Sequence, residues 1–104
     1  MTSAERELIA TYVSSGNECD FCTQSHAAAA RVHFGEDRGL VDQVLADAHA
    51  APVSAKMKAL LAIADKVRRD GRLVQAADVD RARAEGADDK AIHDTVLIAA
   101  AFCM

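Results

Sequence analysis

The chain has 104 residues, the usual size of one globular domain, and we expect residues 1–104 to form a single domain. Its net charge of −4 argues against the concentrated basic face that nucleic-acid binding requires, so we expect no nucleic-acid partner. Its longest apolar stretch is far shorter than the roughly 20 residues that cross a bilayer, so we expect no membrane partner. The first residues do not resemble a signal peptide, and we expect a cytoplasmic protein whose cysteines are reduced at rest.

The composition is strongly helical, because alanine and other good helix formers dominate and Pro52 is the only proline. We therefore expect an all-α bundle of about six helices. In chain order the helices begin at the capping-box sequence Thr2 to Glu5, between Asn17 and Asp20, after Gly39, after Pro52 and Ser54, at Asp78, and after Asp88. Helix ends are marked by Ser14 to Asn17, Gly35, Gly71 and Gly86.

The fourth and the last helix carry the clearest apolar stripes. The fourth has apolar residues at i, i+3, i+4, i+7 and i+10, which are Met57, Leu60, Leu61, Ala64 and Val67. The stripe of the last helix comprises Ile92, Val96, Ala99 and Cys103. That helix is apolar all round from Val96, which implies burial. No stop signal precedes Met104, so we expect a domain that is truncated at its C-terminal end or that finishes inside a helix.

The core contains few large side chains. Only 4% of residues are aromatic, there is no tryptophan, and alanine supplies much of the 51% hydrophobic fraction. Such a domain buries little apolar area per residue, and association with further copies is a common way to bury more. We expect a homo-oligomer.

The segment 17–26 carries the residues suited to chemistry. Cys19, Cys22 and His26 are spaced i, i+3, i+7, so their side chains project from one face of a helix. Cα atoms one turn apart are ~5–6 Å from each other, within the range that a disulfide requires. Both cysteines fall in the first turn of the helix, where free amides and the helix dipole stabilise the reactive thiolate. The pattern predicts a redox pair that opens and closes without dismantling the backbone.

The position of the histidine favours one division of labour between the cysteines. His26 lies ~6 Å along the helix axis from Cys22 but ~10 Å from Cys19. We infer that Cys22 is the thiolate that attacks an oxidant and that Cys19 resolves it as a disulfide. The opposite order stays open, because in many Cys-x-x-Cys helices the first cysteine is the exposed nucleophile.

This arrangement resembles the alkyl hydroperoxidase D-like (AhpD-like) branch of the carboxymuconolactone decarboxylase family. Glu7 stands twelve residues before Cys19, within Arg6 to Ala10, as in the family pattern. Asn17 and the sequence Ser25-His26-Ala27 also match, and the similarity is strongest over residues 5–34.

The resemblance implies a thiol-dependent hydroperoxide reductase with an all-helical fold, assembled as trimers or hexamers. Cys22 would be peroxidatic, Cys19 resolving, and Glu7 with His26 a proton relay that deprotonates Cys22. The substrate would be a hydroperoxide and the reductant an external dithiol, in some members a lipoyl-bearing protein. The resemblance implies no cofactor beyond the Cys19–Cys22 disulfide and no metal.

Two residues depart from the family pattern. Phe21 occupies a position between the cysteines where some members carry histidine, and it cannot relay a proton. Glu18 stands where the family often has a small residue such as glycine. Its carboxylate should disfavour a thiolate at Cys19 and leave Cys22 the more ionised of the two.

Two other functions remain open. A structural zinc site could use Cys19, Cys22 and His26 in a non-catalytic binding or assembly module, but a closed site requires a fourth ligand from elsewhere. A decarboxylase-type reaction belongs to a sister branch of the family, whose members lack the cysteine pair. Glu7 taken alone is most simply a first-turn carboxylate that complements the helix dipole.

The remaining candidates have simple structural interpretations. Thr11 and Ser14 extend a polar stripe from Glu7, which is compatible with a partly wet active site. We expect Tyr12 to pack in the core and Cys103 to behave as a small buried hydrophobic residue. The other histidines, expected at the surface or at an interface, are His33, His49 and His93.

Overall fold

The structure, a computed structural model, describes residues 1–35 and 39–102. Across these residues the chain is helical and contains no strand, so the predicted all-α class is confirmed. The elements are α1 (Ser3–Gly16), α2 (Asp20–Phe34), α3 (Gly39–Ala46), α4 (Ala55–Arg69), the short 3₁₀ helix η2 (Gly71–Leu73), α5 (Ala76–Ala84) and α6 (Asp89–Ala101).

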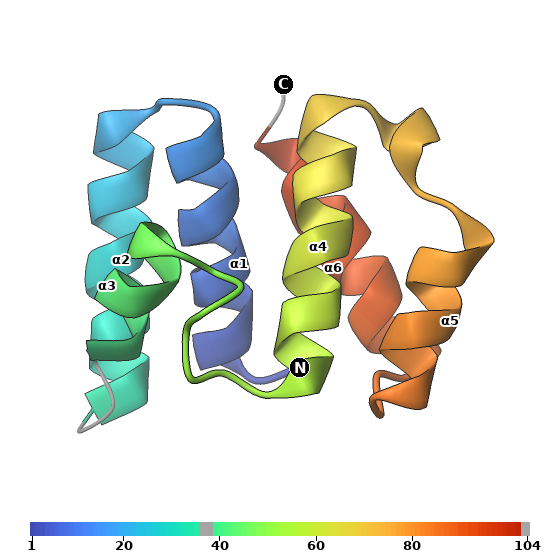
Figure 1. Cartoon of the computed structure of the whole chain (residues 1–104). Coiled ribbons are helices and arrows are strands. Elements are labelled where there is room, and N and C mark those ends of the chain that lie inside the picture. The colour runs from blue at the N-terminus through green and yellow to red at the C-terminus, as the bar shows by residue number, and fades with distance from the viewer. Residues whose placement is uncertain (36–38, 103–104) are drawn as a thin grey trace.

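The helices form two groups that meet at α1 (Figure 1). On one side, α1 and α2 make an antiparallel hairpin joined by a short turn, with α3 packed against both. On the other side, α4 and α6 pack against α1 and against each other, with α5 outermost. The end of α6 reaches the same end of the bundle as the α1–α2 turn. Three helices therefore converge near the start of α2.

Capping residues begin the helices where the sequence predicts. The Thr2 hydroxyl accepts a hydrogen bond from the Glu5 amide at 3.1 Å, and the Glu5 carboxylate accepts one from the Thr2 amide at 2.9 Å. Ser54 caps α4 through the amide of Met57, and Asp88 caps α6 through the amide of Ala91. Each cap satisfies a donor that the first helical turn leaves unpaired.

The core lies between α1, α4 and the helices that cover them. Its largest fully buried apolar side chains are Leu8, Ile9, Val13, Val41, Val44, Leu60, Leu61 and Ile63. Buried alanines occupy many of the remaining helix–helix contacts and permit close approach. The predicted stripe of α4 is buried except for Val67, which is half-buried.

The apolar stripe predicted for the last helix is confirmed at Ala99 and wrong at Ile92 and Val96. α6 buries Ala91, Thr95 and Ala99, whereas Ile92 and Val96 are only half-buried. Thr95 is tolerated in the core because its hydroxyl donates to the carbonyl of Ala91 at 2.8 Å.

The sequence also predicts that the last helix is buried on all sides from Val96 onward, and this prediction is wrong for the single chain. The side chain of Leu97 on α6 is 53% exposed. Cys103, expected to be buried, lies outside the described residues. The fifth helix begins at Ala76 rather than at Asp78, because the Asp78 carboxylate accepts the amide of Gln75 and so occupies the third helical position.

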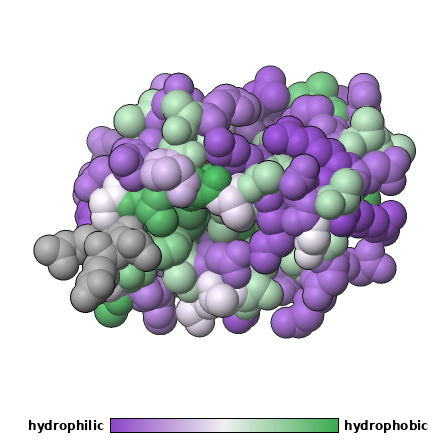
Figure 2. All heavy atoms as spheres, turned by 60° about the horizontal axis from the view of Figure 1, so that its bottom comes forward, coloured by the Kyte–Doolittle hydropathy of each residue, from purple (hydrophilic) through white to green (hydrophobic). Residues whose placement is uncertain are grey.

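An apolar patch covers part of the end of the bundle opposite the α1–α2 turn (Figure 2). A cavity of about 170 Å³ lies there. Its apolar lining comes from Leu8, Phe34, Leu40, Val53 and Met57. In the part of the chain that is described, no helix combines the length and the hydrophobicity needed to cross a membrane.

Candidate active site

The turn between α1 and α2 places Cys19 at the start of a helix. Glu18 adopts a left-handed backbone conformation, with φ at 60°, and this reverses the chain after α1. The Cys19 amide donates to the carbonyl of Ser14 at 3.1 Å, which fixes the turn against the end of α1. The Cys19 carbonyl accepts the amide of Thr23 at 2.9 Å, the first hydrogen bond of α2. Cys19 is therefore the N-cap residue of α2, and Cys22 lies in its first turn.

The two cysteine sulfurs lie next to each other. Both thiols are free, and the Cys19 and Cys22 Sγ atoms are 2.6 Å apart. Two sulfurs in contact on one helical turn can be joined as a disulfide without dismantling the backbone. Both residues are partly exposed, which leaves the sulfurs within reach of small molecules. The one-turn spacing thus brings the pair into position for disulfide exchange.

The contact between the thiols separates their acidities. A hydrogen bond from the Cys22 thiol, helped by the Cys22 backbone amide, lowers the pKa of Cys19 below its ordinary value. The same hydrogen bond, together with burial, raises the pKa of Cys22. This order is opposite to the one expected from the charge of Glu18. The reason is proximity, because a donor in direct contact outweighs the carboxylate of an exposed residue.

Glu7 and His26 form a dyad across the α1–α2 interface. His26 Nδ1 lies 2.7 Å from Glu7 Oε2, and each side chain is 30% exposed. The ring edge packs at right angles to the ring of Phe102, with centroids 4.8 Å apart. Nδ1 is engaged by the carboxylate, so Nε2 is the nitrogen left to exchange a proton. Within the described residues, His26 makes no hydrogen bond to either sulfur.

The end of α6 also contacts this region. The sequence did not predict that contact. The Asn17 side-chain amide donates to the carbonyl of Phe102 at 2.9 Å, linking the α1–α2 turn to the C-cap of α6. Asn17 could be singled out by its match to the family, but no local pattern marks Phe102. Its role depends on how α6 packs against the hairpin.

The polar stripe of α1 is buried, so the expectation of a partly wet stripe is wrong beyond Glu7. Thr11 and Ser14 are 0% and 1% exposed. The Thr11 hydroxyl donates to the carbonyl of Glu7 at 2.7 Å. The Ser14 hydroxyl has no hydrogen-bond partner among the residues that the structure describes.

Comparison with known proteins decides the family. The carboxymuconolactone decarboxylase family profile matches residues 2–66, more than half of the chain and all of the thiol site. The chain belongs to this family. It belongs to the AhpD-like branch, as the resemblance predicted.

Two solved structures are similar to this family member over nearly its whole length. An uncharacterized peroxidase-related protein from Silicibacter sp. TM1040 is 32% identical with a TM-score of 0.88, covering 99% of this chain and 53% of that one. An alkylhydroperoxidase AhpD core from Ralstonia eutropha JMP134, also described as peroxidase-related, is 30% identical with a TM-score of 0.89, covering 98% and 53%. The chain therefore spans about half the length of these proteins. No curated protein matches it.

The other residues considered from the sequence lie away from the thiols of this AhpD-like chain or point to solvent. Phe21 is 82% exposed, which agrees with its inability to relay a proton inside the site. His33, His49 and His93 are exposed. No group of three or more histidine, cysteine, aspartate or glutamate side chains arranged to hold a metal ion occurs within residues 1–35 and 39–102. The zinc alternative has no ligand set in that part of the chain.

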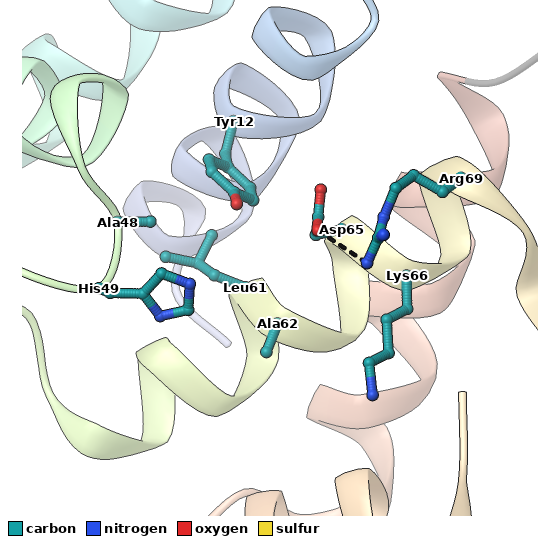
Figure 3. A pocket seen from close by; sticks show the side chains of 8 residues that line it. All are labelled: Tyr12, Ala48, His49, Leu61, Ala62, Asp65, Lys66 and Arg69. Atoms are coloured by element: carbon teal, nitrogen blue, oxygen red, sulfur yellow. Dashed lines mark ion pairs between the residues drawn. The ribbon is translucent and has the colours of Figure 1, made fainter. Parts of the chain in front are cut away.

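Tyr12 is half-buried and packs against the core, as expected, and it lines a cavity of about 180 Å³ between α1 and α4 (Figure 3). Burial raises the pKa of its phenol. The charged groups of this cavity already have partners. Asp65 pairs with Arg69 at 3.3 Å, and Lys66 pairs with Asp78 at 2.8 Å. No charge in the cavity therefore requires a ligand to balance it.

Proposed function

We propose that the chain is a thiol-dependent hydroperoxide reductase that cycles between a Cys19–Cys22 dithiol and a disulfide. The observation that carries the proposal is the 2.6 Å contact between the sulfurs on the helix that also bears His26, paired with Glu7. The family and the peroxidase-related names of the similar structures support the substrate class. A zinc-binding module has no group of three or more candidate ligands among the described residues, and a decarboxylase of the sister branch would leave the cysteine pair unused.

Oxidation proceeds in two balanced steps. His26, oriented by Glu7, takes the proton of Cys22 through water, and the thiolate attacks the terminal oxygen of the hydroperoxide. The O–O bond breaks, the leaving alkoxide takes a proton and departs as an alcohol, and Cys22 becomes a sulfenic acid. The Cys19 thiolate then attacks the Cys22 sulfur. The S–O bond breaks, water leaves, and the disulfide forms.

An external dithiol, such as a lipoyl group, returns two electrons and two protons and restores both thiols. The attack on Cys22 releases Cys19 as the leaving thiolate, at the N-terminus of α2, where the helix dipole stabilises an anion. Persistent reduction requires a reducing compartment, and we place the cycle in the cytoplasm. The working form is a homo-oligomer, a trimer or a hexamer by family resemblance.

The test is consumption of cumene hydroperoxide coupled to oxidation of dihydrolipoamide. We expect turnover by the wild-type chain, and loss of at least ~100-fold in Cys22→Ser and Cys19→Ser, since each removes a covalent step. Glu7→Gln should lower the rate by ~10–100-fold, the range of a general acid–base contribution. Cys103→Ser is the matched control and should keep the wild-type rate. Full activity in both cysteine variants, Cys22→Ser and Cys19→Ser, would contradict the proposal.

The order of attack is tested by trapping. Treating Cys19→Ser with one equivalent of hydroperoxide and dimedone should label Cys22, and peptide mass spectrometry locates the adduct. Labelling of Cys19 in Cys22→Ser, with none on Cys22 in the reciprocal variant, would reverse the roles while keeping the reaction.

A further inference from the structure

The ring of Phe102 lies against the imidazole of His26. The two ring centroids are 4.8 Å apart, and the ring planes are nearly perpendicular, at 87°. Perpendicular packing at this separation is one of the favoured arrangements of aromatic rings. Phe102 is half-buried at the C-terminal end of α6 and packs against the core, and the reaction described above gives it no part. It nevertheless contacts a residue of the proposed proton relay.

Phe102 is itself held in place through both polar groups of its backbone. Its amide donates to the carbonyl of Ile98 at 3.2 Å, within the C-cap of α6. Its carbonyl accepts a hydrogen bond from the Asn17 side-chain amide at 2.9 Å. Asn17 is the C-cap of α1, in the turn that precedes Cys19, and it lies 85 residues before Phe102 in the chain. The end of α6 is therefore fastened to the turn that carries the thiols.

One hydrogen bond leaves an imidazole some freedom to turn. Nδ1 of His26 lies 2.7 Å from Glu7 Oε2, and this contact holds one point of the ring. The ring can still rotate about that point, because the χ2 angle of histidine has a broad energy minimum. A second contact, made by the ring as a whole, restricts this rotation. Phe102 supplies that contact from α6, whereas Glu7 belongs to α1.

We infer that Phe102 is a positioning residue for His26, which acts together with Glu7 to hold the imidazole in one orientation. The carboxylate selects the nitrogen that carries the proton, and the phenyl ring limits the directions in which the other nitrogen is presented. Phe102 is apolar, so it competes for no proton and keeps water from the part of the imidazole that it covers. The inference rests on the proposed function, since the orientation of His26 matters for turnover only if His26 takes the Cys22 proton.

The test follows the imidazole nitrogens of His26 by NMR in the fully reduced, full-length protein with isotope-labelled histidine, and His26→Asn identifies the signals. The pH is about 8.5, roughly two units above the ordinary imidazole pKa, so the rings are neutral. The wild type should show one protonated and one unprotonated nitrogen. In Phe102→Leu, which keeps an apolar side chain, both signals should shift toward the averaged values of a mobile imidazole. Phe102→Tyr keeps the aromatic ring and should keep the wild-type spectrum.

Phe34→Leu is the matched control for a purely structural loss. Phe34 is also half-buried and packed against the core, but it lines the cavity at the opposite end of the bundle. This variant should lose a similar amount of stability in thermal denaturation and leave the His26 signals unchanged. Wild-type signals in Phe102→Leu, or an equal shift in Phe34→Leu, overturn the inference.

A second variant reaches the same contact from the other side. Asn17→Ala removes the donor to the Phe102 carbonyl at an exposed position and should shift the His26 signals in the same direction as Phe102→Leu. Should Phe102→Leu fail to fold, unchanged signals in Asn17→Ala overturn the inference instead.

A kinetic readout separates this inference from the proposed function. In the peroxide assay Phe102→Leu should lower kcat by about 3–10-fold, part of the ~100-fold that a general base contributes. KM should stay near the wild-type value, because Phe102 acts through His26 and not on the substrate. The NMR readout needs no peroxide, so absence of peroxide consumption by the wild type would reject the proposed function without changing the result for Phe102. A wild-type spectrum in Phe102→Leu, with peroxide turnover by the wild type, would reject the inference and keep the proposed function.

Discussion

Glu7 and His26 belong to different helices, so the hydrogen bond between them depends on how α1 packs against α2. The 2.7 Å contact fixes the imidazole by Nδ1 and orients the ring, whose edge also rests on Phe102. A carboxylate that holds one ring nitrogen selects the tautomer and the orientation of the ring. Because both side chains are 30% exposed, protons can exchange with solvent after each turnover.

Glu18 carries backbone strain that a single substitution can relieve. Its φ of 60° lies in the left-handed region, which costs an L-residue other than glycine ~1 kcal/mol or more. Glu18→Gly should therefore raise the free energy of unfolding by about 1 kcal/mol, measured by urea denaturation. Glu18→Ala removes the same carboxylate but keeps the strain, so it should give no comparable gain. Equal stability of the two variants would show that the charge, not the backbone, is the source of any change.

Part of the candidate site could be predicted at the residue scale, and part could not. The helical period alone places Cys19, Cys22 and His26 on one face, and the sulfurs do meet. The acidity order of the thiols was predicted wrongly, because it depends on a hydrogen bond between side chains rather than on the nearest charge in sequence. The contact of Glu7 with His26 requires the register of two helices, which no local pattern specifies.

At the scale of elements, capping decided how well helix boundaries could be predicted. Thr2, Ser54 and Asp88 carry side-chain oxygens that accept first-turn amides, and the helices begin where these residues stand. The start of α5 was misplaced because Asp78 closes a capping box from inside the helix. The buried face of α6 was misplaced because Thr95 satisfies its own hydroxyl and enters the core, which a hydropathy pattern does not anticipate.

The cap of α4 supports much of the core. The Ser54 hydroxyl accepts the Met57 amide at 3.1 Å at the start of a helix that buries six side chains. Ser54→Ala should lower the free energy of unfolding by about 1 kcal/mol, the usual cost of losing such a cap. Ser54→Asp keeps an acceptor and should stay close to the wild type in the same thermal or urea denaturation. If both variants lose the same stability, the cap hydrogen bond is not the cause.

At the scale of the whole molecule, the chain is small and leaves large apolar side chains at its surface. Leu97 on α6 is 53% exposed although the sequence around it is apolar on all sides. On α2, Phe21 and Val32 are 82% and 79% exposed. The similar structures are about twice as long as this chain. These features support the expectation that further protein surface covers part of the bundle.

The C-terminal half of α6 has the most apolar composition, and we expect its exposed side to be buried against a second copy of the chain. Sedimentation equilibrium should then give a mass for the wild type above the 11.0 kDa of one chain. Leu97→Asp should shift the distribution toward the monomer, because a buried unpaired carboxylate opposes association. Leu73→Asp is the matched control, since Leu73 is a leucine of similar exposure, 42%, that lies in η2 rather than in α6, and it should sediment like the wild type. A wild-type mass of one chain, or an unchanged mass in Leu97→Asp, would contradict association through α6.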